Sequence, residues 1–77
     1  MMARYFFNIH GAHESPDEEG EELPDNEVAW KEATIIAGEL FRNIDGELRP
    51  GQEWALEVAD EQRKPLFLIR ISAQKMK

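Results

Sequence analysis

The sequence has 77 residues and no cysteine, which suffices for one small domain and excludes disulfides, thiolate metal sites and cysteine nucleophiles. Its 16 acidic and 9 basic residues give a formal net charge of −7, so nucleic acid is an unlikely partner. A domain of this size buries only about 60% of the surface of its unfolded chain. We therefore expect residues 1–77 to form a single domain that gains stability from a second copy or another protein partner.

The first predicted element is a strand from Ala3 to His10, rich in the aromatic and β-branched residues typical of strands. Alternation places Tyr5, Phe7 and Ile9 on one face of a sheet. The opposite face then carries Arg4, Phe6, Asn8 and His10. Neither this segment nor any other resembles a signal peptide or the roughly 20 apolar residues of a membrane span. We expect a cytoplasmic protein that does not bind membranes.

The segment from His13 to Glu27 holds eight carboxylates and no lysine or arginine. Pro16 to Gly20 has the composition of a tight turn, in which Gly20 adopts a positive φ. A short strand at about residues 21–23 is expected to return beside the first strand. If Gly20 were the sixth residue of an EF-hand loop, the twelfth would be an asparagine instead of the required glutamate, so that motif is excluded.

Other metal or catalytic chemistry has little support in the sequence. His10 and His13, with Glu14 and Asp17, could in principle hold a divalent ion, but they lie at a strand end and match no metal signature. There is also no nucleophile elbow and no phosphate-binding glycine loop. We predict no metal ligands, no cofactor and no enzymatic activity.

A helix is predicted to begin after Asp25, a favourable N-cap residue, and to end near Gly46, which can adopt a left-handed conformation. Its apolar positions fall on one stripe, with Trp30 and Phe41 on the flank. The stripe consists of Ala29, Ala33, Ile36, Ala37, Leu40 and Ile44. Val28 and Ile35 lie on the opposite face and are an alternative interaction surface.

Two more strands are predicted, from Glu53 to Ala59 and from Leu66 to Ala73, joined by a polar hairpin loop. The inward residues are Trp54, Leu56, Val58, Phe67, Ile69 and Ile71. We expect the last strand to lie between the first strand and the 53–59 strand. The fold class is then two-layer α+β, with one helix packed on a small, mainly antiparallel sheet of three long strands and one short strand.

The sheet face away from the helix is the preferred candidate for a functional surface. Nothing in the sequence obviously covers it, and an apolar patch with a charged rim is typical of a protein contact. We predict that Arg4, Phe6, Leu68 and Arg70 form this surface. The region from Gln62 to Lys77 has five basic residues and no acid, so it could attract the acidic segment within one chain or between two.

Several segments resemble a family of short uncharacterised proteins, a domain of unknown function, from rhizobia and related bacteria. They are Arg4-Tyr-Phe-Phe-Asn-Ile-His10, Pro16-Asp-Glu-Glu-Gly-Glu-Glu-Leu-Pro-Asp25, Leu56-Glu-Val-Ala-Asp60 and Leu66-Phe-Leu-Ile-Arg70. The resemblance implies a bacterial cytoplasmic protein and no assigned activity. The helix opening Pro-Asp-Asn-Glu-Val-Ala is also similar to small antitoxins of the HicB type. Our hypothesis is a non-catalytic protein-interaction or self-associating module. The alternatives are an antitoxin-like regulator linked to nucleic acid and a metal-binding protein.

Overall fold

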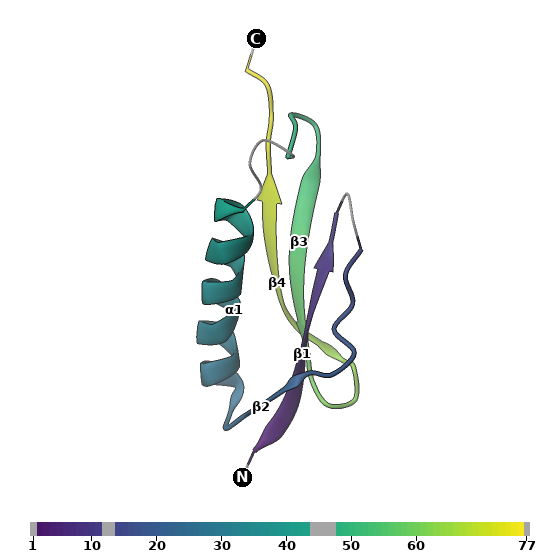
Figure 1. Cartoon of the computed structure of the whole chain (residues 1–77), viewed down its shortest axis with the longest axis vertical. Coiled ribbons are helices and arrows are strands. Elements are labelled where there is room, and N and C mark those ends of the chain that lie inside the picture. Colours follow the sequence, from purple (N-terminus) through teal and green to yellow (C-terminus); the bar gives the residue numbers. More distant parts are fainter. Residues whose placement is uncertain (1, 12–13, 44–47, 77) are drawn as a thin grey trace.

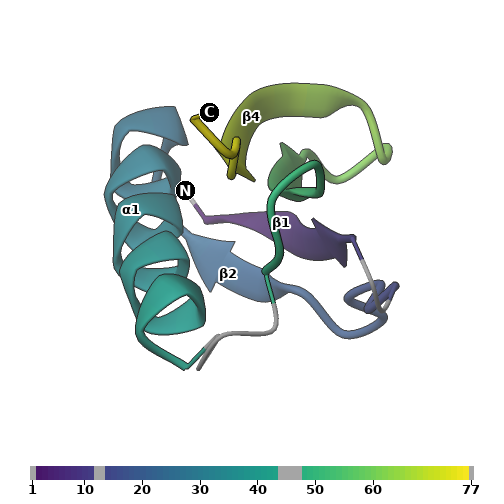
Figure 2. The same ribbon diagram turned by 90° about the horizontal axis from the view of Figure 1, so that it is seen from above.

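The computed structural model describes residues 2–11, 14–43 and 48–76. Its elements are β1 (Ala3–His10), β2 (Glu21–Leu23), α1 (Asn26–Arg42), β3 (Glu53–Ala59) and β4 (Pro65–Ser72). The strands form one antiparallel sheet and α1 packs against one face of it (Figure 1; Figure 2), which confirms the predicted α+β class. The molecule is elongated, with extents of 50 × 19 × 18 Å.

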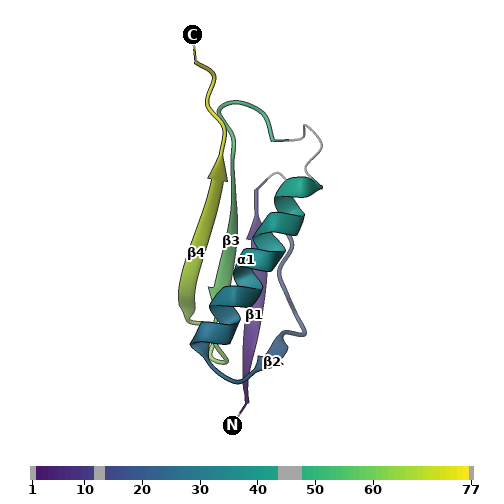
Figure 3. The same cartoon turned by 90° about the vertical axis from the view of Figure 1, so that its left-hand side faces the viewer.

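The strand order is β2-β1-β3-β4, so our prediction that the last strand lies beside the first is wrong. β3 takes the central place because its side chains are mostly buried. β4 begins with Pro65, which cannot donate a ladder hydrogen bond, and it carries exposed Leu68 and Arg70. These features favour an edge position, and Figure 3 shows β4 along one margin of the sheet.

The helix begins where the sequence predicts, but it ends at Arg42, before the predicted end near Gly46. The side chain of Asp25 accepts a hydrogen bond from the Val28 backbone N–H at 2.9 Å and so caps the first turn. Asn43 is the C-cap residue, and its N–H donates to the Glu39 carbonyl at 3.1 Å. The predicted roles of Gly46 and Ile44 fall outside the described residues.

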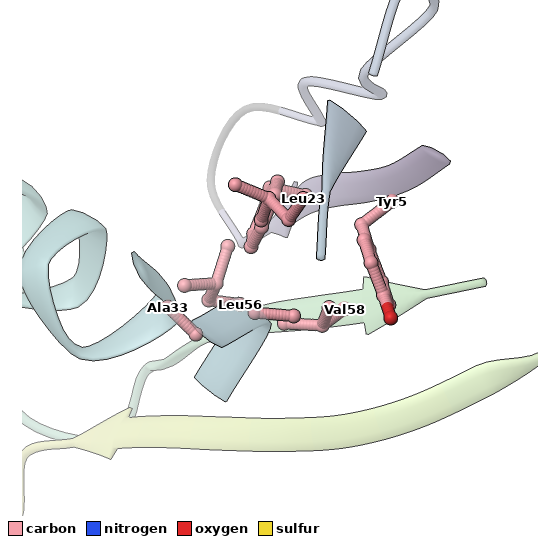
Figure 4. Packing of buried hydrophobic residues seen from close by; sticks show 7 residues of the cluster. Tyr5, Leu23, Ala33, Leu56 and Val58 are labelled. Carbon is pink, nitrogen blue, oxygen red and sulfur yellow. The ribbon is translucent and has the colours of Figure 1, made fainter. Parts of the chain in front are cut away.

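The core forms where the predicted stripe of α1 meets the inner face of the sheet. Alanines at positions 29 and 33 are fully buried, and their small size lets the helix approach the strands closely. Figure 4 shows Tyr5, Leu23 and Val58 packed in this cluster, and the Tyr5 hydroxyl donates to Asn26 Oδ1 at 2.8 Å. Leu23 is buried in the core and belongs to the short strand β2, whose position was predicted.

The hairpin of β3 and β4 contains an irregularity that the alternation did not predict. Val58 pairs with Phe67 and Ala59 pairs with Pro65, so Leu66 is an extra residue in β4. Such a bulge redirects a side chain and bends the strand. Leu66 therefore packs against the core cluster, although strict alternation with the inward residue Phe67 would place it on the opposite face.

Candidate functional site: the edge formed by β4 and α1

The sheet face away from α1 is covered near β1, contrary to our prediction. Phe6 is only 7% exposed, and Asn8 on the same face is 9% exposed. The loop of residues 14–20 lies over this region, and the guanidinium carbon of Arg63 stands 3.6 Å from the centre of the Phe6 ring. This arrangement is a cation–π contact in which a residue of the basic region covers an aromatic ring.

Asp17 anchors the loop to the sheet. Its carboxylate accepts backbone N–H groups from Phe7, Glu19 and Gly20 at 3.1, 3.2 and 3.0 Å. Burial raises the pKa of Asp17, but these three hydrogen bonds and the nearby Arg63 charge more than offset it, so the pKa lies below its usual value. Gly20 has φ 74, which confirms the predicted positive φ.

A polar network continues from Asp17 along the sheet. The Asp17 N–H donates to Asn8 Oδ1 at 2.8 Å, and the Asn8 amide donates to Glu57 Oε1 at 3.3 Å. His10 then lies 3.7 Å from Glu57 through Nε2 and 2.7 Å from Glu14 through Nδ1. The hydrogen bond with Glu14 raises the pKa of His10, and the same bond lowers the pKa of the Glu14 carboxyl.

This network joins the loop to the sheet and contains no evident metal centre. Within residues 2–11, 14–43 and 48–76, no group of three or more histidine and acidic side chains is arranged to hold a metal ion. The predicted contribution of His13 falls outside the described residues. The side chains of His10 and Glu14 are 44% and 66% exposed, so their contact is largely solvated.

The structure does not bring the preferred surface residues together. Because β3 separates β1 from β4, Leu68 shares a cross-strand row with Glu57 and Asn8, two strand spacings from β1. Arg4 contacts the acidic segment, with its Nη2 atom 3.0 Å from Glu22 Oε2. Phe6 and Leu68 therefore do not form one apolar patch.

The two residues of the alternative surface, Val28 and Ile35, differ in exposure and do not form one surface. Val28 is half-buried and packs against the core cluster, because the first helical turn lies close to the sheet. Ile35 is 57% exposed. Only Ile35 thus remains as an apolar surface residue of the predicted pair.

Three of the exposed large apolar side chains, Trp30, Phe41 and Leu68, lie along the edge formed by β4 and one flank of α1, which we call the β4 edge. The half-buried residues Phe67, Ile69 and Ile71 complete it. Trp30 and Phe41 are 39% and 62% exposed, and they lie on the same flank, about three helical turns apart. The Trp30 and Phe67 ring centres are 5.2 Å apart, so this flank faces β4. No described strand pairs with the outer side of β4.

An open pocket of about 330 Å³ lies at one end of the β4 edge, beside the first turn of α1. It is lined by Asn26, Glu27, Trp30 and Phe67, so two aromatic rings and one carboxylate meet there. Aromatic faces and a nearby carboxylate together attract a cationic side chain with an apolar stem.

Sequence reasoning placed Trp30 and Phe41 on the helix flank but gave them no functional role. It also missed the pocket, because the pocket depends on the β4 edge being free. Pro65 at the start of the last strand was the local sign of an edge position. The Asp17-x-x-Gly20 spacing likewise indicated a loop tied by its own carboxylate.

Comparison with known proteins identifies the family but no activity. A family model described as a domain of unknown function, DUF6894, matches residues 4–72, and the chain belongs to this family. No curated protein and no solved structure matches the sequence. Among the described residues, no helix has both the length and the apolar character needed to cross a membrane.

Proposed function

Starting from a family without an assigned activity, we propose that the chain is a non-catalytic module that self-associates through the β4 edge. The observation that carries the proposal is the open side of β4. In an edge strand, backbone N–H and C=O groups remain free to pair with another strand. Here the strand also presents apolar side chains on both faces, including Leu68 at 50% exposure.

The amount of exposed surface supports association. The chain exposes 5641 Å², whereas a compact monomer of 8.9 kDa exposes about 4,800 Å². The excess follows from the elongated shape, with extents of 50 × 19 × 18 Å, which leaves a long side of the molecule open to a partner. A partner along the long axis of the molecule would remove part of this excess.

A second copy is the partner that fits an edge strand of this kind. Two β4 strands can pair antiparallel about a two-fold axis perpendicular to the sheet, which gives one continuous sheet. Both α1 helices then lie on the same face, and their Trp30 and Phe41 flanks point toward the seam. Backbone pairing and apolar burial therefore use the same surface.

Sedimentation equilibrium at micromolar concentration tests the proposal. We expect the wild type to be a dimer and Leu68→Lys combined with Phe41→Lys to be a monomer, because lysines on an edge strand oppose pairing. Ile35→Lys is the matched control, since its side chain is similarly exposed but lies outside the β4 edge. A monomeric wild type, or a dimer lost only in Ile35→Lys, would contradict the proposal.

The other functions have weaker support. Arg4 and Arg63 contact the acidic segment of their own chain, which leaves fewer basic groups for nucleic acid. The charge of −7 also opposes that partner. We further propose a bacterial cytoplasmic protein, on the resemblance of the Arg4–His10 and Pro16–Asp25 motifs.

A further inference from the structure

We propose that the pocket beside α1 receives Lys75 of a second copy. The inference rests on the proposed β4 dimer and identifies the occupant of its pocket. Within one chain, the segment after β4 and the first turn of α1 lie at opposite ends of the long axis, which extends over 50 Å (Figure 1). A chain therefore cannot fill its own pocket with this segment.

Antiparallel pairing brings the two ends together between copies. α1 and β4 run in the same direction along the molecule, so the second β4 runs toward the start of the first α1. If the two-fold axis passes at Ile71, then Lys75 of the second copy comes level with Phe67. Phe67 is one wall of the pocket.

Within residues 71–75, alternation assigns Ile71, Ala73 and Lys75 to the face that carries α1, and Lys75 is the one charged residue among them. Phe67, Ile69 and Ile71 point to the face that carries α1. The extended chain continues past β4, since Ala73 exchanges backbone hydrogen bonds with Gly51 and Gln52 at 2.8 and 3.3 Å. If the chain stays extended to Lys75 in the dimer, the same period of two points Lys75 to the α1 face and Met76 away from it.

The chemistry of the pocket suits a lysine. Its four-carbon stem can lie against Trp30 and Phe67 while the ammonium group approaches the Glu27 carboxylate. The partial positive charge at the α1 N-terminus opposes a cation, but Asp25 and Glu27 both place negative charge at this turn. The sequence from Gln62 to Lys77 contains no acidic residue, and the nearest acid across the sheet, Glu53, pairs with Ser72.

Charge reversal measures the contact in the dimer. We expect Lys75→Glu to raise the dimer dissociation constant about tenfold, because each dimer contains two such contacts. Lys31→Glu makes the same charge change on an exposed helix residue and should alter the constant less than about twofold. Combining Lys75→Glu with Glu27→Lys should restore most of the wild-type affinity.

A cysteine pair locates the contact directly, because the chain has no other cysteine. A short bismaleimide cross-linker, which spans the length of a lysine–glutamate pair, should join Glu27→Cys to Lys75→Cys in a mixture of the two proteins and should join Glu27→Cys to Met76→Cys much less. Two results together would overturn this inference but leave the proposed dimer standing. They are equal cross-linking at positions 75 and 76, and equal effects of Lys75→Glu and Lys31→Glu on a dimer that still forms. A monomeric wild type would overturn the proposed function and this inference together.

Discussion

Two regions of the sheet face that points away from α1, one at β1 and one at β4, differ in how they are covered. At β1, the loop of residues 14–20 and Arg63 reduce the exposure of Phe6 to 7%, whereas Leu68 on β4 stays 50% exposed. Both residues face away from the α1 layer in strands of similar pattern. An apolar side chain in an alternating strand thus reveals its face, but its neighbours decide whether it is a core residue or a contact surface.

The largest expected effect comes from truncating the covered aromatic residue. Phe6→Ser should destabilise the monomer by about 3–5 kcal/mol, because a buried ring is lost and a hydroxyl is placed in its cavity. Leu68→Ser should change monomer stability by less than about 0.5 kcal/mol. Urea unfolding at the lowest measurable concentration compares them, and equal effects would contradict the difference between the two regions.

A substitution in the covering loop should be the next most harmful. Gly20→Val should cost about 2–3 kcal/mol, because φ 74 disfavours a β-branched residue. A Cβ atom there would also lie 2.9 Å from the Tyr5 carbonyl oxygen. The control is Gly38→Ala in the open helix surface, which should stabilise by about 0.5–1 kcal/mol. Thermal melting compares Gly20→Val with Glu18→Gln, a substitution in the same loop. Equal melting temperatures for the two variants would contradict the prediction.

The stabilisation that Asp17 gives by anchoring the loop should depend on pH in the acid range. Asp17→Asn should destabilise the protein by about 1–3 kcal/mol at neutral pH, because the carboxylate accepts three backbone N–H groups. The pKa of Asp17 is lowered by folding, so this stabilisation exists above the unfolded pKa of about 3.9 and is lost as pH falls through the folded pKa. Unfolding curves from pH 7 to pH 2 should therefore converge for wild type and variant; a constant difference would contradict the anchor role.

The smallest effect concerns His10, where the network reaches solvent. Folding raises the pKa of His10, mainly through the hydrogen bond to Glu14. The stabilisation that His10 adds to the folded state is therefore fully present below the unfolded pKa of about 6.5, and it is lost as pH rises through the folded pKa. His10→Gln should thus be slightly less stable than wild type at pH 5.5 and equal to it at pH 9. NMR titration of the His10 ring gives the folded pKa, and a value below 6.5 would contradict the prediction.

Local chemistry in the sequence determined the secondary structure and much of the packing. Alternation identified the inner residues of the strands, Asp25 identified the start of the helix, and the sequence before Gly20 identified a turn with positive φ. These features depend on residues close together in the chain. The free energy of forming a helix start, a turn or an alternating strand depends mainly on residues within a few positions in the sequence.

Only the tertiary structure decided which strand lies at the edge and which apolar side chains are covered. The choice between β3 and β4 as the neighbour of β1 compares two long-range pairings, and side-chain alternation does not rank them, although Pro65 is a local sign that favours β4 at the edge. The burial of Phe6 requires Asp17 and Arg63 to arrive from separate segments. The pocket at Trp30 and Phe67 exists because helix and edge strand meet there. Such contacts arise from packing distant parts of the chain, which the period of one element cannot reveal.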